Sequence, residues 1–530
     1  MEKRLILAIA LSIFIIMSFQ IMAPKGPHSP SVTVVTKEAP PTVLPKDTII
    51  SAPSAAEVAI QEKELKVDTD RYILTFSNMG GAIKNIWLKE YKDIHTGGPL
   101  WLADIRNPKE YIFTISSADI PGIDIAAYSL TRSDNTITYF LSTKDFEISK
   151  RYTLHNSKYG IELEVSIRNI SDSPRSFNYN IIGGAGINET KHEDKRFLEV
   201  TSVVDGKYIG FKRPKDKRIT NLGIVAWTAL KSKYFSLILK PLFTTRGQFY
   251  KEDNTGLLTM GVDVGETVIQ PKSVLINKYL LYAGPSHIPA LKEFGYGLES
   301  TVSYGFFGGI SKVMISVMRF FHSIVQSWGL SIILLSVFLN FILFPLTMKS
   351  FRSMQKMQEL HPEMERLKKQ YKDNPQKLNK EIMDLYRKYN INPFSGCLPI
   401  LLQMPIFIAL YSALMRSIEL RNASFLWIRD LSAPDAVKLP FALPIIGNNI
   451  NILPLVMVLA MALQQKISTK SMGGAVTVEQ KEQQRLMMIM MPIVFGFVFY
   501  NMPSGLVLYW LVNTALTIFE QGVILKKSTT

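Results

Sequence analysis

Residues 329–348, GLSIILLSVFLNFILFPLTM, decide the fold class of this chain, because these 20 residues carry no charge and a single asparagine, Asn340. A second uncharged run of 20 residues, GCLPILLQMPIFIALYSALM, covers residues 396–415 and includes one glutamine, Gln403. A helix needs about 20 apolar residues to cross the hydrocarbon core of a bilayer, and neither run has the polar face of a soluble core helix. Three shorter apolar runs follow at 451–465, 486–502 and 505–519. The sequence therefore predicts a membrane-embedded bundle of helices.

A few polar side chains lie inside these apolar runs. Asn340 and Gln403 occupy the first two runs, and Asn513 and Thr517 occupy the last. Polar groups at membrane depth are costly and usually face a bundle interior or a wet cavity. We therefore expect these four side chains to line a polar cavity inside the bundle.

The composition excludes several classes of function. The 530 residues are 47% hydrophobic and carry a formal charge of +16, which suits anionic lipid, topology signals or nucleic acid. The sole cysteine, Cys397, excludes an intramolecular disulfide, and the histidines lack metal-ligand spacing. Phosphate-loop, dinucleotide-binding and nucleophile-elbow motifs are absent from the sequence. We expect no catalytic residue, no cofactor, no metal and no enzyme activity.

The N-terminal region predicts an anchor and a tether. Residues 1–22 place Lys3 and Arg4 before an apolar run that lacks a small-residue cleavage site, which favours an uncleaved transmembrane signal anchor. Residues 23–64 follow, with seven prolines between positions 23 and 54, and predict an extended linker.

Residues 65–300 change to a β pattern. More than ten short runs alternate apolar and polar residues and are separated by turn signals. Clear examples are residues 72–76, 136–140, 160–168, 234–239 and 273–281. This pattern predicts a large antiparallel sandwich, and its place after a signal anchor predicts an exported domain.

Residues 301–327 predict an amphipathic helix. Its polar positions recur at spacings of four and three: Lys312, Ser316, Arg319, Ser323 and Gln326. We expect this helix to lie in the membrane interface with a thin basic stripe. The alternative is a helix that packs on the sandwich.

Residues 349–395 predict a basic helical hairpin, with 11 Lys or Arg against 6 Asp or Glu and a break at Asp373-Asn374-Pro375. Its methionines suit soft contacts with partners, although they can equally fill the hairpin's own core. Residues 466–485 are also net basic, whereas residues 419–438 balance three charges of each sign. The positive-inside rule therefore places both termini, the hairpin and the 466–485 loop in the cytoplasm.

Five short sequence motifs complete the pattern. They are FPLT at 344–347, NPFSGCLP at 392–399, QMPIF at 403–407, LWIRDL at 426–431 and MPSGLVLY at 502–509. Through these motifs and the order of its segments, the chain resembles the YidC membrane protein insertases of Gram-negative bacteria, in the YidC/Oxa/Alb family. The resemblance covers essentially the whole chain.

The resemblance implies a multi-domain membrane protein of six transmembrane helices, a periplasmic all-β super-sandwich and a cytoplasmic hairpin. The implied segments after the interfacial helix are transmembrane 328–348, hairpin 349–395, transmembrane 396–417, periplasmic loop 418–449, transmembrane 450–466, cytoplasmic loop 467–485, transmembrane 486–502, transmembrane 505–525 and cytoplasmic tail 526–530.

The implied function is to insert, fold and assemble integral membrane proteins in the bacterial inner membrane, alone or with the Sec translocon, through a cytoplasm-facing hydrophilic groove. The implied partners are nascent membrane proteins, the Sec translocon with its accessory proteins, the ribosome and signal recognition pathway, and anionic lipids. Specific nucleic acid is not among them.

The resemblance also implies a set of groove residues. They are Ser336, Asn340, Gln403, Met404, Phe407, Tyr509 and Trp510. The family has an arginine five residues before the proline of the FPLT motif, where this chain has Asn340. The chain therefore departs from the family's positively charged groove, and the alternative for Asn340 is a plain hydrogen bond to a neighbouring helix.

The chain also lacks the family's long basic tail. We therefore expect Lys368, Lys369 and Lys372 of the hairpin to dock the ribosome or targeting factors.

Three other classes of function compete with insertion. A small-solute or ion transporter calls for paired charges at mid-membrane or inverted repeats with broken helices, and the sequence shows neither. A membrane enzyme calls for a catalytic cluster that the sequence lacks. A non-catalytic assembly scaffold fits the same segments as an insertase.

Overall fold

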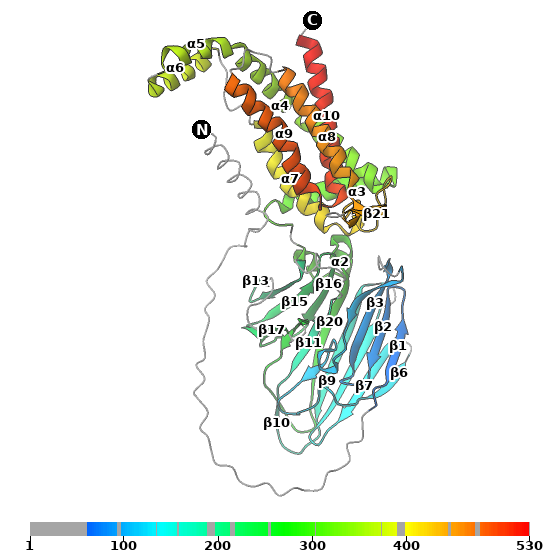
Figure 1. The fold of residues 1–530 in the computed structure, drawn as a ribbon. Helices are drawn as coiled ribbons and strands as arrows, with labels where there is room; N and C mark the ends of the chain where they lie inside the picture. The colour runs from blue at the N-terminus through cyan, green and yellow to red at the C-terminus, as the bar shows by residue number, and fades with distance from the viewer. Residues whose placement is uncertain are drawn as a thin grey trace, which may run out of the picture. The chain divides into compact units, whose positions relative to one another are not determined.

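A computed structural model describes residues 61–92, 97–133, 135–155, 158–187, 197–211, 218–252, 256–302, 304–372, 374–389, 398–443, 447–471 and 478–528. The expected signal anchor, most of the linker and the end of the tail lie outside these residues. The chain divides into two compact units, a β unit up to Gly284 and a helical unit from Pro285 onward (Figure 1). A short segment, Lys231–Ser236, groups with the helical unit.

The β unit contains three main antiparallel sheets. The nine-stranded sheet runs in the order β13 (Lys207–Phe211), β12 (Glu199–Val204), β15 (Val225–Lys231), β16 (Phe235–Pro241), β20 (Val274–Pro285), β9 (Gly160–Asn169), β8 (Phe146–Leu154), β7 (Thr136–Ser142) and β6 (Ser129–Ser133). The five-stranded sheet is β14 (Arg218–Leu222), β17 (Gly247–Glu252), β18 (Leu258–Asp263), β11 (Asn180–Ala185) and β5 (Ile115–Ser116). The four-stranded sheet is β1 (Glu64–Asp68), β2 (Tyr72–Ser77), β3 (Ala82–Lys92) and β4 (Pro99–Asp104). A small ribbon pairs β10 (Arg175–Phe177) with β19 (Thr267–Ile269).

The sheets pack face to face, which confirms the predicted β-sandwich. Gly183 of β11 lies directly over Leu239 of β16, since a Cβ added to Gly183 would stand 2.5 Å from the Leu239 Cβ. On the four-stranded sheet, the ring of Phe76 lies 5.0 Å from that of Tyr152 of β8. The five runs singled out in the sequence fall on β2, β7, β9, β16 and β20.

One buried cation interrupts this apolar core. Lys150 of β8 is fully buried, and its Nζ donates to the carbonyl oxygens of Gly80 at 2.6 Å and Phe113 at 2.8 Å. Burial lowers the pKa of Lys150 to about 7. The side chain therefore ties two loops of the sandwich to its larger sheet.

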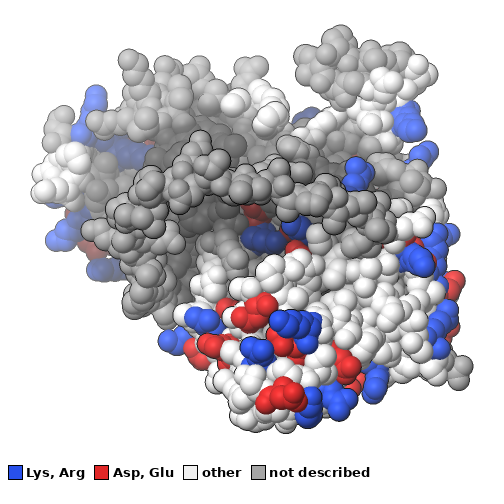
Figure 2. All heavy atoms as spheres, turned by 90° about the horizontal axis from the view of Figure 1, so that it is seen from below, with Lys and Arg blue, Asp and Glu red and all other residues white. Residues whose placement is uncertain are grey.

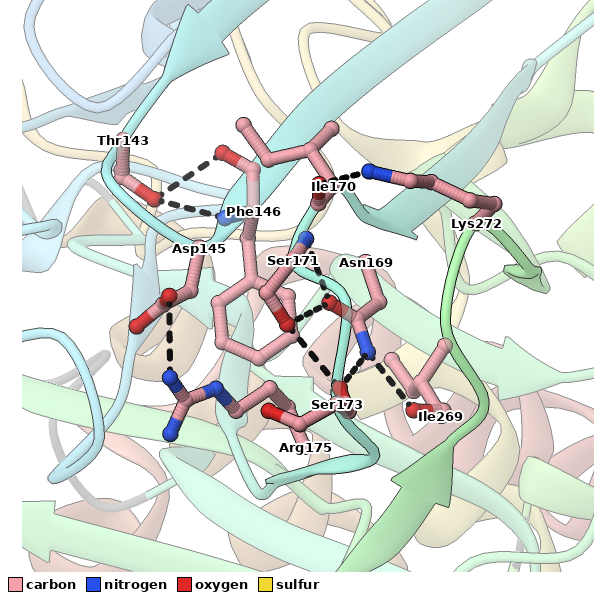
Figure 3. A network of polar contacts seen from close by, with 10 residues as sticks. All are labelled: Thr143, Asp145, Phe146, Asn169, Ile170, Ser171, Ser173, Arg175, Ile269 and Lys272. Carbon is pink, nitrogen blue, oxygen red and sulfur yellow. Dashed lines mark hydrogen bonds and ion pairs between the residues drawn. The ribbon is translucent and has the colours of Figure 1, made fainter.

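The loop between β9 and β10 is fixed by side-chain hydrogen bonds (Figure 3). Asn169 is fully buried, and its Nδ2 donates to the carbonyl oxygens of Ser173 and Ile269, each at 2.9 Å. Its Oδ1 accepts from the backbone N–H and the hydroxyl of Ser171, at 3.0 Å and 2.7 Å. All its side-chain polar groups are engaged, within the turn and with β19 (Thr267–Ile269), so this cluster is structural.

The charges on the face shown in Figure 2 are mixed, with basic and acidic side chains interspersed. A surface of alternating sign is typical of a solvated protein and lacks the single-sign stripe that binds a nucleic-acid backbone.

The helical unit begins after the last strand of the sandwich, and its first elements start before the expected domain boundary at residue 300. Its elements are α2 (Ile288–Phe294), η3 (Leu298–Thr301), α3 (Gly308–Val325), α4 (Trp328–Glu359), α5 (His361–Gln370), α6 (Pro375–Lys388), α7 (Leu398–Arg416), η5 (Ile418–Leu420), β21 (Val437–Leu443), β22 (Gly447–Ile450), α8 (Ile452–Ser471), α9 (Val478–Phe499) and α10 (Ser504–Ser528).

Two breaks shape the segment between α4 and α7. The helix α4 continues through residues 349–359, since Met, Lys, Gln and Glu are good helix formers. It ends before Pro362, which has no N–H to donate in a continuing helix. The second break lies where the sequence places it, because the Asn374 side chain caps α6 by accepting from the Lys377 N–H at 3.0 Å. The first break was not predicted.

The helical unit has an apolar interior and an apolar exterior. Its core joins α3, α4, α7, α8 and α10 through Met318, Ile332, Leu410, Met457 and Val507. Outward-facing side chains are equally apolar, with Phe341 78%, Leu459 71% and Phe497 83% exposed. Exposed apolar surface of this extent is suited to lipid rather than water.

One helix among the described residues is both long and apolar enough to cross a membrane. Its span is Trp328–Ser353, with a mean hydropathy of 2.3. Shorter apolar helices cover Ile452–Ser468 and Ile489–Phe499. The expected number of six spans stays a prediction.

Candidate functional site

The helix α10 carries a series of polar contacts to three other helices of the bundle. Gln403 of α7 donates from Nε2 to the Tyr509 hydroxyl at 3.0 Å. Asn340 of α4 donates from Nδ2 to Oδ1 of Asn513 at 2.7 Å. Further along α10, the Ser468 hydroxyl of α8 donates to Oε1 of Gln521 at 3.1 Å. Tyr509, Asn513 and Gln521 of α10 therefore make cross-helix contacts within the bundle.

The helical repeat explains why these residues meet. Tyr509, Asn513 and Thr517 are spaced by four residues, so they lie on one face of α10. The helices α4 and α10 run in the same direction, because Gly505 lies against Ile332 and Asn513 against Asn340 with the same offset of 173 residues. This parallel packing keeps the polar face of α10 against α4 over several turns.

Asn340 is held at two points. Its Nδ2 also donates to the Ser336 carbonyl oxygen of its own helix at 3.0 Å, and the side chain is part-buried. Ser336 is fully buried, and its hydroxyl donates to the Ile332 carbonyl oxygen at 2.8 Å. Asn340 thus makes the hydrogen bond to a neighbouring helix that the sequence left as an alternative. The Ser336 hydroxyl is satisfied within α4 and does not reach the other polar residues.

An aromatic cluster lies beside the polar face. The rings of Phe407 and Trp510 are 5.1 Å apart and nearly perpendicular, and Trp510 lies 5.3 Å from Phe499. Edge-to-face packing of this kind is favourable for aromatic rings. Met404, on the same helix as Phe407, is 47% exposed. The predicted groove residues therefore divide into a polar set on α4, α7 and α10 and an apolar set beside it.

Gln521 and Ser468 were missed by the sequence analysis. The signal was present in the four-residue repeat 509, 513, 517, which reaches position 521 at its next step. The Thr517 hydroxyl, by contrast, donates to the Asn513 carbonyl oxygen of its own helix at 2.8 Å.

The predicted docking lysines lie at the end of α5 and just beyond it. Lys368, Lys369 and Lys372 are exposed, and none forms an ion pair with another residue that the structure describes. The helices α5 and α6 contact each other where the Tyr386 hydroxyl lies 3.1 Å from the Met364 sulfur. These lysines are therefore free to meet an anionic partner.

Two protein families and several full-length relatives match this chain. A family model described as the YidC periplasmic domain matches residues 64–317, and one described as 60Kd inner membrane protein matches residues 320–530. A membrane protein insertase YidC from Geobacter metallireducens is 32% identical to this chain, over 99% of this chain and 98% of that protein. The chain belongs to the YidC membrane protein insertase family. The YidC insertase of Pelobacter propionicus is 33% identical over 99% of both chains.

Among solved structures, the chain is similar to an active YidC insertase with its first transmembrane domain resolved. That similarity covers 87% of this chain and 92% of the other, with 18% identity and a TM-score of 0.36. The β unit and the first part of the helical unit, up to residue 317, match the family's periplasmic domain, and the helical unit from residue 320 onward matches the inner membrane protein.

Several carboxylates among the described residues form ion pairs or hydrogen bonds within the protein. In those residues, no group of three or more His, Cys, Asp or Glu is placed to hold a metal ion. The buried carboxylate of Glu110, for example, accepts from Lys251 at 2.6 Å and from the Thr259 hydroxyl at 2.8 Å. These contacts stabilise the sandwich and leave the α10 contacts as the candidate site.

Proposed function

We propose that this chain inserts, folds and assembles integral membrane proteins in the bacterial inner membrane. The observation that carries the proposal is the polar face of α10, where Asn513 and Tyr509 meet Asn340 and Gln403 in an otherwise apolar bundle. Full-length similarity to insertases supports it.

The mechanism rests on solvation. A client segment brings a polar tail that must cross hydrocarbon, and an unmet polar group there costs roughly 2–7 kcal/mol. The amides of Asn340, Asn513 and Gln403 are uncharged donors and acceptors that exchange partners with a passing tail at modest cost. The polar contacts along α10 thereby shorten the dry path.

The apolar part of the client leaves sideways into lipid. Met404, Phe407 and Trp510 offer it an apolar surface beside the polar face. Transfer of apolar area from water yields about 25 cal/mol per Å2, which drives the step without a nucleotide or a covalent intermediate.

The proposed topology has six transmembrane helices, both termini and the hairpin in the cytoplasm, and the β unit in the periplasm. The basic residues of 349–395 support this orientation. Lys368, Lys369 and Lys372 then face the ribosome and targeting factors, and the Sec translocon is a lateral partner for larger clients.

The test is reconstitution of the full chain into vesicles of phosphatidylethanolamine and phosphatidylglycerol. A small phage-coat-type client is added, and its translocated tail is measured by protease protection. Protection that depends on this chain supports insertion. Client binding without protection favours an assembly scaffold, and flux of small solutes or ions without protection favours a transporter.

A further inference from the structure

The carboxylate of Glu419, in the short helix η5 that follows α7, makes contacts with segments far apart in the sequence. Its Oε1 accepts from Nε and Nη2 of Arg319 at 2.8 Å and 2.6 Å, and it lies 3.1 Å from Nε2 of His287. Its Oε2 accepts from the Ser417 hydroxyl at 2.6 Å. The carboxylate therefore joins η5 to α3 and to His287, the residue before α2.

The ion pair is largely withdrawn from water. The side chains of Glu419, Arg319 and His287 are 13%, 29% and 24% exposed. Burial alone would raise the pKa of Glu419, but the hydrogen bond from His287 and the charge of Arg319 outweigh it and hold that pKa well below its usual range. An ion pair of this kind fixes the position of one segment relative to the other, because the departure of either partner leaves the other charge unpaired in a poorly solvated site.

The helix α3 has three faces rather than the two that its sequence predicts. One face is buried and includes Met314 and Met318. A second is exposed and apolar, with Val313 63%, Phe320 62% and Ile324 63% exposed. The third holds the predicted basic stripe, and its Arg319 is not a free cation in the structure but the partner of Glu419.

The apolar and the polar face of α3 lie about 90° apart on a helix with 3.6 residues per turn. A rotation of α3 by about that angle would therefore bring its water-facing residues to the lipid side. The Ser311 hydroxyl holds the first turn by donating to the Ala409 carbonyl oxygen at 2.8 Å. Glu419 holds Arg319, about two turns further along.

We propose that Glu419 is a positioning residue that sets the rotation of α3, so that the Val313–Ile324 face meets lipid and the Lys312–Ser323 face meets water. The inference rests on the proposed function only in that α3 lies in the membrane interface.

The test follows the surroundings of single positions on α3 in the full chain. Cys397→Ser removes the only native cysteine, and a fluorophore is attached at Val313→Cys or at Ser316→Cys. In phosphatidylethanolamine and phosphatidylglycerol vesicles, a quencher on the lipid acyl chain should act at position 313 and aqueous iodide at position 316. The contrast is the difference between positions 313 and 316 in quenching by the lipid quencher and by iodide. Glu419→Gln and Arg319→Gln should each reduce this contrast, and the double variant should lose no more of it than either single variant.

Lys312→Gln is the matched control, because it removes an exposed charge from the same helix. Full contrast in Glu419→Gln would overturn the proposal, as would an equal loss in Lys312→Gln. If Glu419→Gln fails to fold, Arg319→Lys decides, since it keeps the charge but loses the two-donor geometry. Partial loss there supports the proposal, and full contrast contradicts it.

Client insertion by the same vesicles separates the two claims. Quenching contrast does not depend on insertion, so a wild-type chain with the expected contrast and no insertion refutes the proposed function while the role of Glu419 stands. Slower insertion in Glu419→Gln than in Lys312→Gln is the expected result.

Discussion

Replacement of Asn340 by leucine is the sharpest perturbation of the proposed site. The change removes the 2.7 Å hydrogen bond from Asn340 to Asn513 and leaves the Asn513 oxygen without that donor. Cross-helix hydrogen bonds in membranes average about 0.6 kcal/mol and reach about 1.7 kcal/mol. We take about 1 kcal/mol for this part-buried pair.

If the same polar contacts lower the barrier for a passing tail, about 1 kcal/mol corresponds to roughly fivefold slower insertion. The assay is the initial rate of protease protection for a client with a polar, uncharged tail. Asn513→Leu should give a similar loss, and the double variant should be little worse, because the two residues share one interaction.

Asn340→Arg should be tolerated and should chiefly improve clients with acidic tails, since it adds a charge where this chain has an amide. Phe341→Leu is the matched control, because Phe341 follows on the same helix and is 78% exposed. Crosslinking from position 340 to a stalled nascent chain tests contact directly. A wild-type rate for Asn340→Leu, with no crosslink from that position, would refute the groove role of Asn340.

Three further predictions concern other parts of the chain. Charge reversal of Lys368, Lys369 and Lys372 should weaken ribosome association in a salt-dependent way, and binding that is unchanged across salt would contradict it. A deletion of residues 68–275 that keeps the anchor and α3 should retain insertion, so complete loss in a stably expressed deletion would show that the β unit is required. For Lys150, whose pKa falls to about 7 with burial, the unfolded chain binds the extra proton between pH 7 and about 10.5. The free energy of unfolding should therefore rise with pH in that window by at most about 1.4 kcal/mol per unit and stay flat below it. Denaturant titrations of wild type and Lys150→Met test this, because Met has an apolar side chain of similar shape to Lys and no titratable group, so it should remove the dependence of unfolding free energy on pH in that window. The same pH dependence in both proteins would be inconsistent with a buried neutral amine at position 150.

Local patterns in the sequence determined the elements themselves. Uncharged runs such as 329–348 predicted helices of membrane length, and the structure has α4 there. Alternating runs predicted strands, and the clearest of them fall on strands of the sandwich. Both patterns depend on the side-chain periods of 3.6 and 2, which are set by neighbours in the chain. The break at Asn374-Pro375 is local for the same reason.

Only the tertiary structure decided which residues meet. The nine-stranded sheet sets β20 beside β9, which are more than 100 residues apart, and no local period encodes such an order. Lys150 shares the inward face of β8 with Tyr152, although its residue type predicts exposure.

The candidate site divides in the same way. The residue types Asn340 and Gln403 marked a polar interior from sequence alone, but their partners on α10 lie 173 and 106 residues away. Arg319 belonged to a surface stripe by its spacing and became half of a part-buried ion pair with Glu419 only because the fold sets α3 beside η5. Helical periodicity fixes the face on which a residue lies, whereas packing between distant segments decides whether that face meets lipid, water or a partner side chain.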